Sequence, residues 1–434
     1  LANRPDIVRA DYMEQLTKLQ DDVPPFPNDQ AFAIIEGELG RPIAEVYSAI
    51  SDEPIAAASL GQVYKATLRE TGEEVAIKVQ RPGIEPIIYR DLVLFRALAF
   101  FINAVSQRRL GCNAQLIVDE FGEKLLEELD YVQEGRNLRD FYANFKNDPI
   151  VKIPRLYPEQ SGKAVLTMEW IDGARLTDVA RLATAGVTPA ALLDRGVRCS
   201  LHQLLETGFM HSDPHPGNLV VSERGELVYL DFGMVVEVPP RARRAMIRGL
   251  VGFVNRDASG VVSDLIELDF LPRDVDATAA AEALRVVFED AAAATETKPD
   301  PDPAGRSRTQ TPLNRVRGSD DFLGVVSQLS AALSTRGFRL PPYFARILRA
   351  LAALEGTATT IDRDFKVIER AYPYVLARVL ADRSPEARES LRRLVLEPDG
   401  RSVRWSRVSR LARAYAGGGG GGNGKGKGGD VGAE

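Results

Sequence analysis

Apolar residues recur along the chain with two different periods, and this pattern predicts a mixed α+β protein. In the first fifty residues the spacing is helical, with a proline-rich break at residues 24–27 and an expected helix end at Gly40. Short runs of strand-forming residues follow, separated by Gly61 and by Thr71-Gly72. Turn residues between short strands are typical of an antiparallel meander. We therefore expect three adjacent strands, over residues 55–60, 63–68 and 74–79.

Longer helices alternate with further short strands in the rest of the chain. Residues 192–205 carry a wide apolar helical stripe, which we expect Gly208 to end. A second such stripe begins at Phe344, and Gly356 is its expected end. The other expected helices cover residues 90–104, 114–145 and 241–250. The other expected strands cover residues 164–171, 218–221 and 227–230.

This arrangement predicts six segments. They are an N-terminal helical extension (1–50), a first lobe with inserted helices (51–168), a second lobe (169–290), a flexible insertion (291–320), a C-terminal helical region (321–415) and a disordered glycine-rich tail (416–434). Within the C-terminal region, arginines at every third position from Arg401 to Arg413 predict a basic amphipathic helix. That helix could dock on its own domain or bind anionic lipid.

Composition excludes several classes of protein. The 434 residues carry 55 basic and 61 acidic side chains, a net charge of −6, so we expect no nucleic-acid partner. Cys112 and Cys199 are isolated, which excludes a disulfide scaffold and a structural zinc site. The most apolar stretch, residues 93–105, is too short to span a membrane and contains Arg96. Because the chain starts at Leu1 without a signal-like segment, we expect its targeting region to be missing.

The residues between the first two expected strands fit a phosphate-binding loop. The kinase pattern G-x-G-x-x-G-x-V can be placed on them with alanines in the first two glycine positions, while Gly61 and Val63 match. The backbone N–H groups of such a loop must approach phosphates, and each added methyl limits that approach. An ordinary alanine-rich turn is the alternative. The candidate nucleotide contacts are Ala56, Ala57, Ala58, Ser59, Gly61, Gln62 and Val63.

A lysine and an acidic helix come next. Val75-Ala76-Ile77-Lys78 matches V-A-I-K and places one ammonium on an otherwise apolar strand. A strand lysine that reaches water is the alternative. Residues 127–134 (EELDYVQE) follow on a helix, and one acid of this helix is needed to hold Lys78 against the phosphates. The spacing does not say which acid, and a solvated acidic face is the alternative.

Two further motifs complete the series. Asp213 and Asn218 lie five positions apart in HSDPHPGN, which is the interval of H-R-D-x-x-x-x-N. Kinase chemistry needs a carboxylate near the attacking oxygen and an amide oxygen on a metal ion, whereas a polar loop is the alternative. Asp231-Phe232-Gly233 then matches D-F-G, with its metal-binding aspartate. The five motifs in this order predict a protein-kinase-like ATP site.

Three departures from an ordinary protein kinase narrow this prediction. The loop is alanine-rich, an extra helix separates Lys78 from the acidic helix, and residues 234–240 lead into a basic helix without any A-P-E. Together with the motifs quoted above and the acidic motif Glu128-x-Asp130, these features resemble the UbiB/ABC1/ADCK atypical kinases. The wording of the motifs is most similar to plastid and cyanobacterial members. The resemblance extends from residue 1 to about residue 255.

The resemblance implies a fold and a set of residue roles. The expected fold is α+β and protein-kinase-like, with two lobes, an N-terminal helical extension, a small-lobe helical insertion and a C-terminal helical region. ATP and Mg²⁺ are the expected cofactors. By resemblance, Lys78 pairs with Glu134, Asp213 is the catalytic aspartate, and Asn218 and Asp231 hold the metal. The residues Met168, Glu169 and Trp170 would form the hinge that contacts adenine.

The resemblance also implies a function. We expect an ATPase, or a kinase of a lipid or small molecule, that regulates prenylquinone metabolism. The expected partners are lipids or enzymes of that pathway. The expected location is the chloroplast, at plastoglobules or thylakoids, with contact to a membrane or lipid droplet. A protein kinase with protein substrates is one alternative, and a nucleotide-binding scaffold with little turnover is another.

Overall fold

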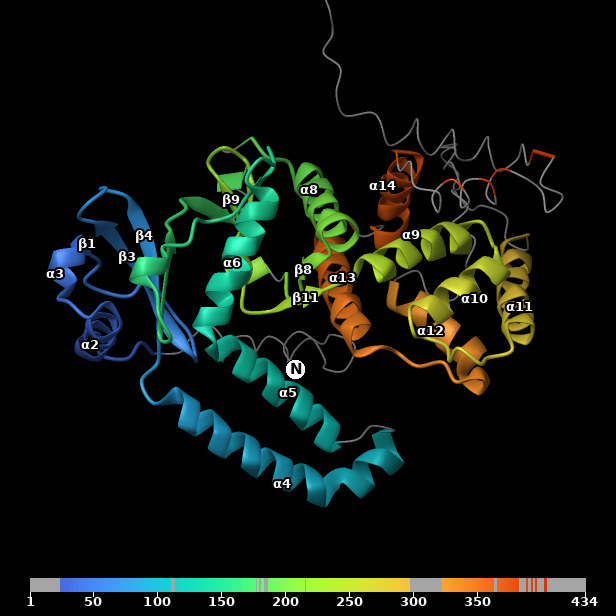
Figure 1. Cartoon of the computed structure of the whole chain (residues 1–434), viewed down its shortest axis with the longest axis horizontal. Helices are drawn as coiled ribbons and strands as arrows, with labels where there is room; N and C mark the ends of the chain where they lie inside the picture. The colour runs from blue at the N-terminus through green and yellow to red at the C-terminus, as the bar shows by residue number, and fades with distance from the viewer. Residues whose placement is uncertain are drawn as a thin grey trace, which may run out of the picture. The chain divides into compact units, whose positions relative to one another are not determined.

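The computed structural model describes residues 24–110, 114–176, 178, 181–182, 186–214, 216–296, 322–362 and 365–381, with single positions at 388, 392, 395, 402 and 403. Contacts divide the chain into two compact units, whose elements are labelled in Figure 1. The first unit contains the described residues up to Thr188 and also Pro216–Val235. The second contains Pro189–His215 and the described residues from Val236 onward. The expected lobe boundary at residue 168 stays a prediction.

The first unit is built on a five-stranded antiparallel sheet. Its strands are β1 (Tyr47–Ile50), β2 (Ala56–Ala57), β3 (Gly61–Leu68), β4 (Glu74–Gln80) and β6 (Val165–Glu169), in the order β1-β3-β4-β6 with β2 beside β3. The expected strands at 63–68, 74–79 and 164–171 are confirmed. The strand expected over 55–60 is wrong in extent, because the Ala58 N–H donates to the Gly61 carbonyl and turns the chain. The sequence pattern missed β1, in which only Tyr47 is buried.

Side chains of this sheet alternate between two faces. One face carries a buried apolar cluster, to which α2 (Asn28–Leu39) and α3 (Ile43–Val46) contribute. That cluster includes Ile35, Val46, Tyr64, Ile77 and Val165. The register pairs Val63 with Lys78 and Lys78 with Leu166, so these three side chains lie on the opposite face. Lys78 therefore points away from the apolar cluster.

Three helices follow β4, namely α4 (Ile84–Leu110), α5 (Ala114–Leu129) and α6 (Tyr131–Phe145). Figure 1 shows α4 and α5 running beside one another, and this pair is the expected small-lobe insertion. The single helix expected over 114–145 is wrong, because Asp130 interrupts it. The Asp130 carboxylate accepts a hydrogen bond from the Gln133 N–H and caps α6. Because α6 begins anew at Tyr131, the cap determines which of its side chains face the sheet.

A second sheet of the first unit has the order β5-β10-β9-β7. Its strands are β5 (Val151–Lys152), β7 (Gly173–Arg175), β9 (Leu219–Ser222) and β10 (Leu227–Tyr229), and the short helices η1 (Pro158–Gln160) and η3 (Pro216–Asn218) belong to the same unit. β9 and β10 confirm the two strands expected there. They are antiparallel, and the Leu230 N–H donates to the Asn218 carbonyl at 3.0 Å. Asn218 therefore lies at the edge of the sheet where the chain leaves β10 towards Asp231.

The second unit is mainly helical. Its elements are α8 (Pro189–His202), the π-helix η2 (Gln203–Thr207), β8 (Phe209–His211), β11 (Val235–Glu237), α9 (Pro240–Val254), α10 (Ala258–Glu267), α11 (Ala277–Glu296), α12 (Phe322–Leu333), η5 (Ser334–Arg336), α13 (Pro342–Ile361) and α14 (Val367–Ala381). Gly208 ends the helical segment with a φ of 70°, as expected. Gly356 does not end α13, because packing on both sides, including buried Leu354 and Ala358, carries the helix past it. The insertion expected from residue 291 begins as helix, since α11 is alanine-rich and runs to Glu296.

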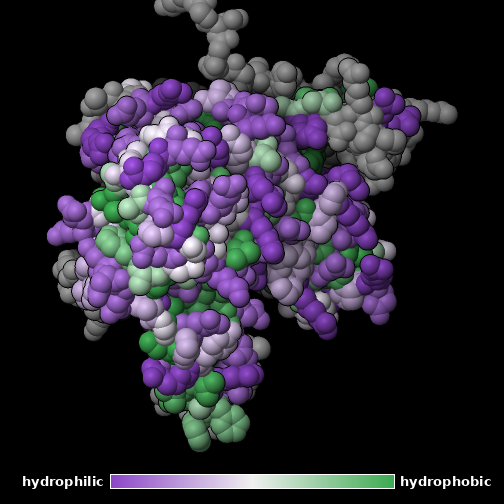
Figure 2. All heavy atoms as spheres, turned by 60° about the vertical axis from the view of Figure 1, so that its left-hand side comes forward, coloured by the Kyte–Doolittle hydropathy of each residue, from purple (hydrophilic) through white to green (hydrophobic). Residues whose placement is uncertain are grey.

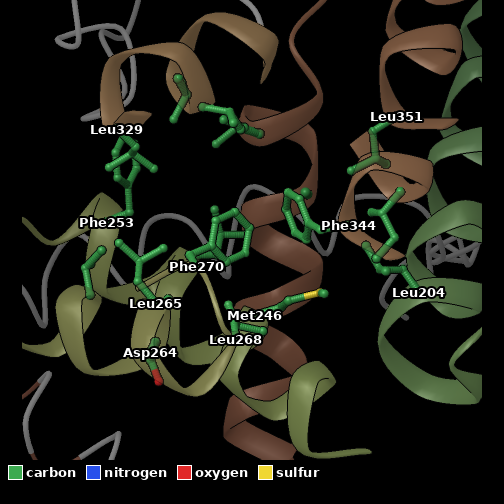
Figure 3. A pocket seen from close by; sticks show the side chains of 18 of the residues that line it. Leu204, Met246, Phe253, Asp264, Leu265, Leu268, Phe270, Leu329, Phe344 and Leu351 are labelled. Carbon is green, nitrogen blue, oxygen red and sulfur yellow. The ribbon is translucent and has the colours of Figure 1, made fainter. Parts of the chain in front are cut away.

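The helices of the second unit line a partly open apolar cavity of about 170 Å³. Figure 3 shows Phe253, Phe270 and Phe344 among the side chains that line it. Asp264 also contributes to the lining, but its carboxylate accepts a hydrogen bond from Arg248 at 2.8 Å, so its charge is compensated. No helix in the described part of the chain combines the length and apolar character that a membrane span needs. The helix expected before residue 24, the basic helix at 401–413 except for Ser402 and Val403, and the glycine-rich tail lie outside the described residues.

Candidate active site

The first unit brings three of the predicted site residues into one ionic cluster. Lys78 of β4 places its Nζ 2.9 Å from both carboxylate oxygens of Glu134 and 3.1 Å from Oδ2 of Asp231. Glu134 comes from the first turn of α6, and Asp231 follows β10. The sequence left the partner of Lys78 open among several acids, and the structure selects the one that the family resemblance implies. Segments 56 and 153 residues apart thus meet at one ammonium group.

Burial and charge shift the protonation equilibria of this cluster. Glu134 is 1% exposed, and burial raises its pKa to about 7, although the Lys78 ammonium opposes the shift. Burial favours the neutral amine of Lys78, but Asp231 and Glu134 raise its pKa well above the ordinary value. Lys78 is therefore cationic at neutral pH, while Glu134 changes its charge near neutrality. The strength of the ion pair thus depends on pH.

Helix α6 also holds the backbone of the Asp231-Phe232-Gly233 segment. The Asn137 side-chain amide donates to the Phe232 carbonyl at 2.8 Å, and the Phe232 N–H lies 3.5 Å from Oε1 of Glu134. The Phe232 ring is fully buried and packs against Phe141 with a centroid distance of 5.2 Å. The sequence analysis missed Asn137. Its position three residues after Glu134, on the same helical face, was the available signal.

A cavity of about 180 Å³ lies beside the ionic cluster. Its lining consists of Ala56, Ala57, Ala58, Ser59, Leu60, Gly61, Val63, Lys78, Glu128, Tyr131, Glu134, Asp231 and Gly233. The alanine-rich loop and the predicted lysine therefore face the same space. Gln62 is the exception among the predicted loop contacts, since the alternation of β3 points its side chain to the other face of the sheet. There its amide donates to the Phe26 carbonyl at 3.2 Å and accepts from the Phe26 N–H at 3.1 Å.

Tyr131 forms an unexpected part of the cavity wall. Its hydroxyl is buried and has no hydrogen-bond partner among the residues that the structure describes. The Lys78 ammonium lies 5.0 Å from the centre of its ring. A Cβ added to Gly61 would lie 2.8 Å from the Tyr131 hydroxyl and 2.5 Å from the Val79 carbonyl, so only glycine fits the loop there. Sequence reasoning had no signal for Tyr131, because a tyrosine at an apolar helix position is normally core.

The acidic motif divides between two roles. Glu128, close to the end of α5, lines the cavity. Asp130 is exposed and caps α6, with its Oδ1 2.9 Å from the Gln133 nitrogen. The cap fixes where α6 begins and so the position of Glu134 four residues later. Glu128, Glu134 and Asp231 thus line the same cavity as Lys78.

The remaining predicted residues lie outside this cavity. Met168 is buried in β6, and Glu169 binds Lys152 at 2.6 Å. The Trp170 N–H donates to the Glu74 carbonyl at 3.0 Å, and its indole nitrogen donates to Asp172. Since none of the three belongs to the cavity lining, the hinge role stays a prediction.

Asp213 belongs to the second unit, where a buried histidine shapes its turn. The Asp213 N–H donates to Nδ1 of His211 at 3.1 Å, so that ring nitrogen is unprotonated. The His211 N–H in turn donates to the side-chain oxygen of Gln203, which lies in the π-helix before β8. π-Helical turns often occur at functional sites. The local structure thus holds the Asp213 backbone, and its catalytic role stays a prediction.

The chemistry of the donors fits a hard divalent cation. The described residues hold no cluster of three or more His, Cys, Asp or Glu side chains that could bind a metal by themselves. Asp231 supplies a carboxylate at the cavity, and the Asn218 carbonyl accepts from the N–H of Leu230, the residue before Asp231, so residue 218 lies at the same sheet edge. Mg²⁺ is usually held by one or two carboxylates together with substrate phosphates and water, rather than by a full protein cage. The residues present therefore fit a magnesium ion that arrives with a nucleotide.

Three features together define a protein-kinase-like domain. A lysine lies on a central strand of an antiparallel sheet, an acid of a packed helix is its partner, and an Asp-Phe-Gly segment lies beside both. A family model, the ABC1 atypical kinase-like domain, matches residues 18–265. The chain belongs to this family, and the α+β kinase-like fold expected from the sequence is confirmed.

Relatives of this chain include plant and cyanobacterial proteins. The chain is 48% identical over 411 residues to the Arabidopsis thaliana protein "ACTIVITY OF BC1 COMPLEX KINASE 1, chloroplastic", covering 95% of this chain and 57% of the relative. It is 41% identical to an uncharacterized protein of Synechocystis sp., with the same coverage of 95% and 57%. Its identity to the Arabidopsis "ACTIVITY OF BC1 COMPLEX KINASE 3, chloroplastic" is also 41%, covering 95% and 54%. The chain therefore spans little more than half the length of these relatives.

A solved structure shows the same fold. It is the complex of Rv3197 with erythromycin from Mycobacterium tuberculosis, which matches with a TM-score of 0.55 and 22% identity, over 85% of this chain and 88% of that chain. At this identity the likeness concerns the fold alone.

Proposed function

We propose that this chain binds ATP with Mg²⁺ and uses it in phosphoryl transfer or ATP hydrolysis. The observation that carries the proposal is the Lys78 ammonium, held between Glu134 and Asp231 at the wall of a cavity that the Ala56–Gly61 loop also lines. Polyphosphates are bound by fixed cations and by loop backbone N–H groups. The nucleotide supplies the phosphoryl group, and the residues of the chain orient it.

Each residue of the cluster has a role in this proposal. Lys78 binds the phosphates, and Glu134 keeps its ammonium in place. Asp231 and Asn218 provide oxygen ligands for the magnesium ion. We assign one further role from the motif alone: Asp213 accepts the proton of the attacking hydroxyl or water.

Tyr131 extends the phosphate site in this proposal. A buried hydroxyl without a partner costs free energy, and it gains most from an acceptor that carries charge. The ring lies close to the Lys78 ammonium, and the hydroxyl approaches Gly61 of the loop. We therefore assign to Tyr131 a hydrogen bond to a phosphate oxygen of the nucleotide.

We also infer a metabolic setting for the chain. The relatives are chloroplast and cyanobacterial proteins, which supports a plastid or cyanobacterial origin. Family membership and the three departures from ordinary kinases favour a lipid or small-molecule acceptor in prenylquinone metabolism over a protein acceptor. Plastoglobules or thylakoids are the corresponding location.

The test compares Mg-ATP binding and hydrolysis in the parent protein with Lys78→Ala, Asp213→Asn and Asp231→Asn. We expect each variant to lose turnover by at least about 100-fold, as when one charge-stabilising group is removed from an active site. Asp231→Asn should also weaken Mg-ATP binding, because a neutral amide is a poorer ligand for Mg²⁺. Lys146→Ala, at an exposed position remote from the cavity lining, is the matched control. Undiminished hydrolysis by Asp231→Asn would contradict the proposal.

The acceptor is tested separately. Turnover is measured with and without a quinone-like lipid and with a general protein substrate. Stimulation by the lipid supports the lipid or small-molecule assignment, whereas phosphate incorporated into the protein substrate supports the protein-kinase alternative. Tight ATP binding without turnover under any condition supports the scaffold.

A further inference from the structure

Helix α4 exposes an unusual amount of apolar surface. The large apolar side chains from Val93 to Ile102 are between 48% and 77% exposed, with Phe101 the most exposed of them. Arg96 is the only charged residue in this stretch. Figure 2 shows hydrophobic side chains at the lower tip of the visible face, where α4 and α5 lie. Soluble proteins rarely leave contiguous apolar surface of this extent uncovered unless it binds something.

One side of α4 packs against the protein. Its buried and half-buried positions between Ile84 and Asn103 are Ile84, Ile88, Asp91, Leu92, Ala99 and Asn103. At about 100° per residue these six positions fall within an arc of about 120°. The contact with α5 is close, since a Cβ added to Gly122 of α5 would lie 3.1 Å from the Leu92 side chain. The α5 helix therefore covers one side of α4 and leaves the remainder open.

The exposed apolar positions occupy much more of the helix circumference. With the same helical geometry, the large side chains from Val93 to Ile102 spread over an arc of about 220°. A helix docked on a flat protein surface buries an apolar stripe of about 100°. A lipid environment covers a helix on every side that the protein leaves free. The width of the arc therefore favours lipid over a protein partner.

The length of the apolar segment sets how it can meet the lipid. The ten residues from Val93 to Ile102 are about 15 Å long, whereas a bilayer core is about 30 Å thick. An apolar segment of this length fits a buried core helix or a helix in the membrane interface, and the exposure of these side chains excludes the buried core. Arg90 and Arg96 are 67% and 63% exposed on the same helix, where they form ion pairs with Asp91 and Asp119, so the charges beside the apolar segment are balanced.

We propose that α4 lies in the interfacial layer of a lipid bilayer, with the aromatic and aliphatic side chains between Val93 and Ile102 inserted among the acyl chains. The α4–α5 pair would then anchor the first unit to a membrane surface. This inference does not depend on ATP binding, because none of the residues involved lines the nucleotide cavity.

The experiment is flotation of the protein with vesicles of phosphatidylcholine, with and without a fraction of anionic lipid. We expect the parent protein to float and the double variant Phe100→Ser, Phe101→Ser to lose at least about tenfold in partitioning, since burying one phenylalanine side chain alone accounts for about that factor. Val286→Ser and Leu380→Ser are matched controls, because these side chains are 49% and 48% exposed on α11 and α14. Both controls should float like the parent. Thermal melting without lipid should show that all variants are folded.

A second measurement reports on the location of the helix. In Phe101→Trp protein, the added indole should shift its emission to shorter wavelength with vesicles and should be quenched by lipids brominated on the acyl chains. Equal flotation of the parent and the double variant would overturn the proposal, and so would a parent that does not bind vesicles. If the double variant instead changes the mass of a protein complex in lipid-free solution, α4 is a protein-binding surface and the proposal is wrong.

Discussion

The Tyr131 hydroxyl allows a test in which one deleted atom has two opposite effects. Tyr131→Phe removes the oxygen and leaves the ring that packs beside Lys78. In the nucleotide-free protein that oxygen is buried and has no hydrogen-bond partner in the described part of the chain. In the proposed complex with ATP it donates to a phosphate oxygen. The variant should therefore stabilise the free protein and weaken the complex.

The structure and typical energies give the size of both effects. An unsatisfied buried polar group costs about 1–3 kcal/mol, so its removal should raise the free energy of unfolding of the free protein by about 1 kcal/mol or more. For a unit of roughly 200 residues this corresponds to a rise in Tm of about 2–4 °C per kcal/mol. Hydrogen bonds to charged groups contribute about 1.5–3 kcal/mol, so the affinity for ATP should fall by about 10-fold to 150-fold.

The assay combines thermal melting with calorimetric titration of Mg-ATP, Mg-ADP and adenosine. The variant should melt higher than the parent without nucleotide and should gain less from ATP and ADP. Adenosine has no phosphate, so its weaker binding should be the same in both proteins. Tyr47→Phe provides the control, because Tyr47 is equally buried but lies in the apolar cluster on the other side of the sheet.

Two results would refute this reasoning. If Tyr131→Phe binds ATP as tightly as the parent, the hydroxyl does not contact phosphate. If the variant melts lower than the parent without nucleotide, the hydroxyl has a stabilising partner in the free protein. A parent protein that binds no nucleotide at all would instead contradict the proposed function.

Three further predictions concern the same site. Gly61→Ala should greatly weaken ATP binding and lower Tm, because its Cβ would lie 2.5 Å from the Val79 carbonyl; nucleotide titration and melting check both effects. Glu134 has a pKa of about 7 in the folded protein, above its ordinary value of 4.5, so its contribution to stability is largest below pH 4.5 and is lost as the pH rises through 7. Nucleotide affinity should instead rise over that range as the ion pair with Lys78 forms, and in Glu134→Gln both pH dependences should be reduced. Asn137→Ala frees the Phe232 carbonyl, so it should lower turnover strongly and Tm only slightly. Normal turnover with a lowered Tm would show a purely structural role.

The elements that carry the chemistry could be predicted because their motifs have fixed spacing and fixed secondary structure. Lys78 lies on a strand, and Asp231 follows one, as the sequence indicated. The choice of Glu134 among the acids of α6 depended on where the helix begins. That start is set by the Asp130 cap, which the helical periodicity alone did not reveal.

Features that depend on tertiary contacts could not be predicted. The roles of Asn137 and Tyr131 come from their surroundings. Asn137 donates to the Phe232 carbonyl, and the buried Tyr131 hydroxyl lies at the cavity wall without a partner among the described residues. The Gln62 side chain faces away from the cavity, which a loop pattern does not reveal because it does not say which way each side chain of β3 points. Gly356 was taken as a helix end, although buried neighbours on both sides outweigh the modest cost of one glycine inside a helix.

The apolar cavity of the second unit has a mechanical consequence. Apolar space of about 170 Å³ that stays dry amounts to at most roughly 100 mL/mol, at the upper end of the volume decreases of about 20–100 mL/mol that accompany protein unfolding. If most of it disappears on unfolding, a hydrostatic pressure of about 1 kbar would lower the stability of this unit by about 2 kcal/mol. Compression should therefore favour unfolding of the second unit.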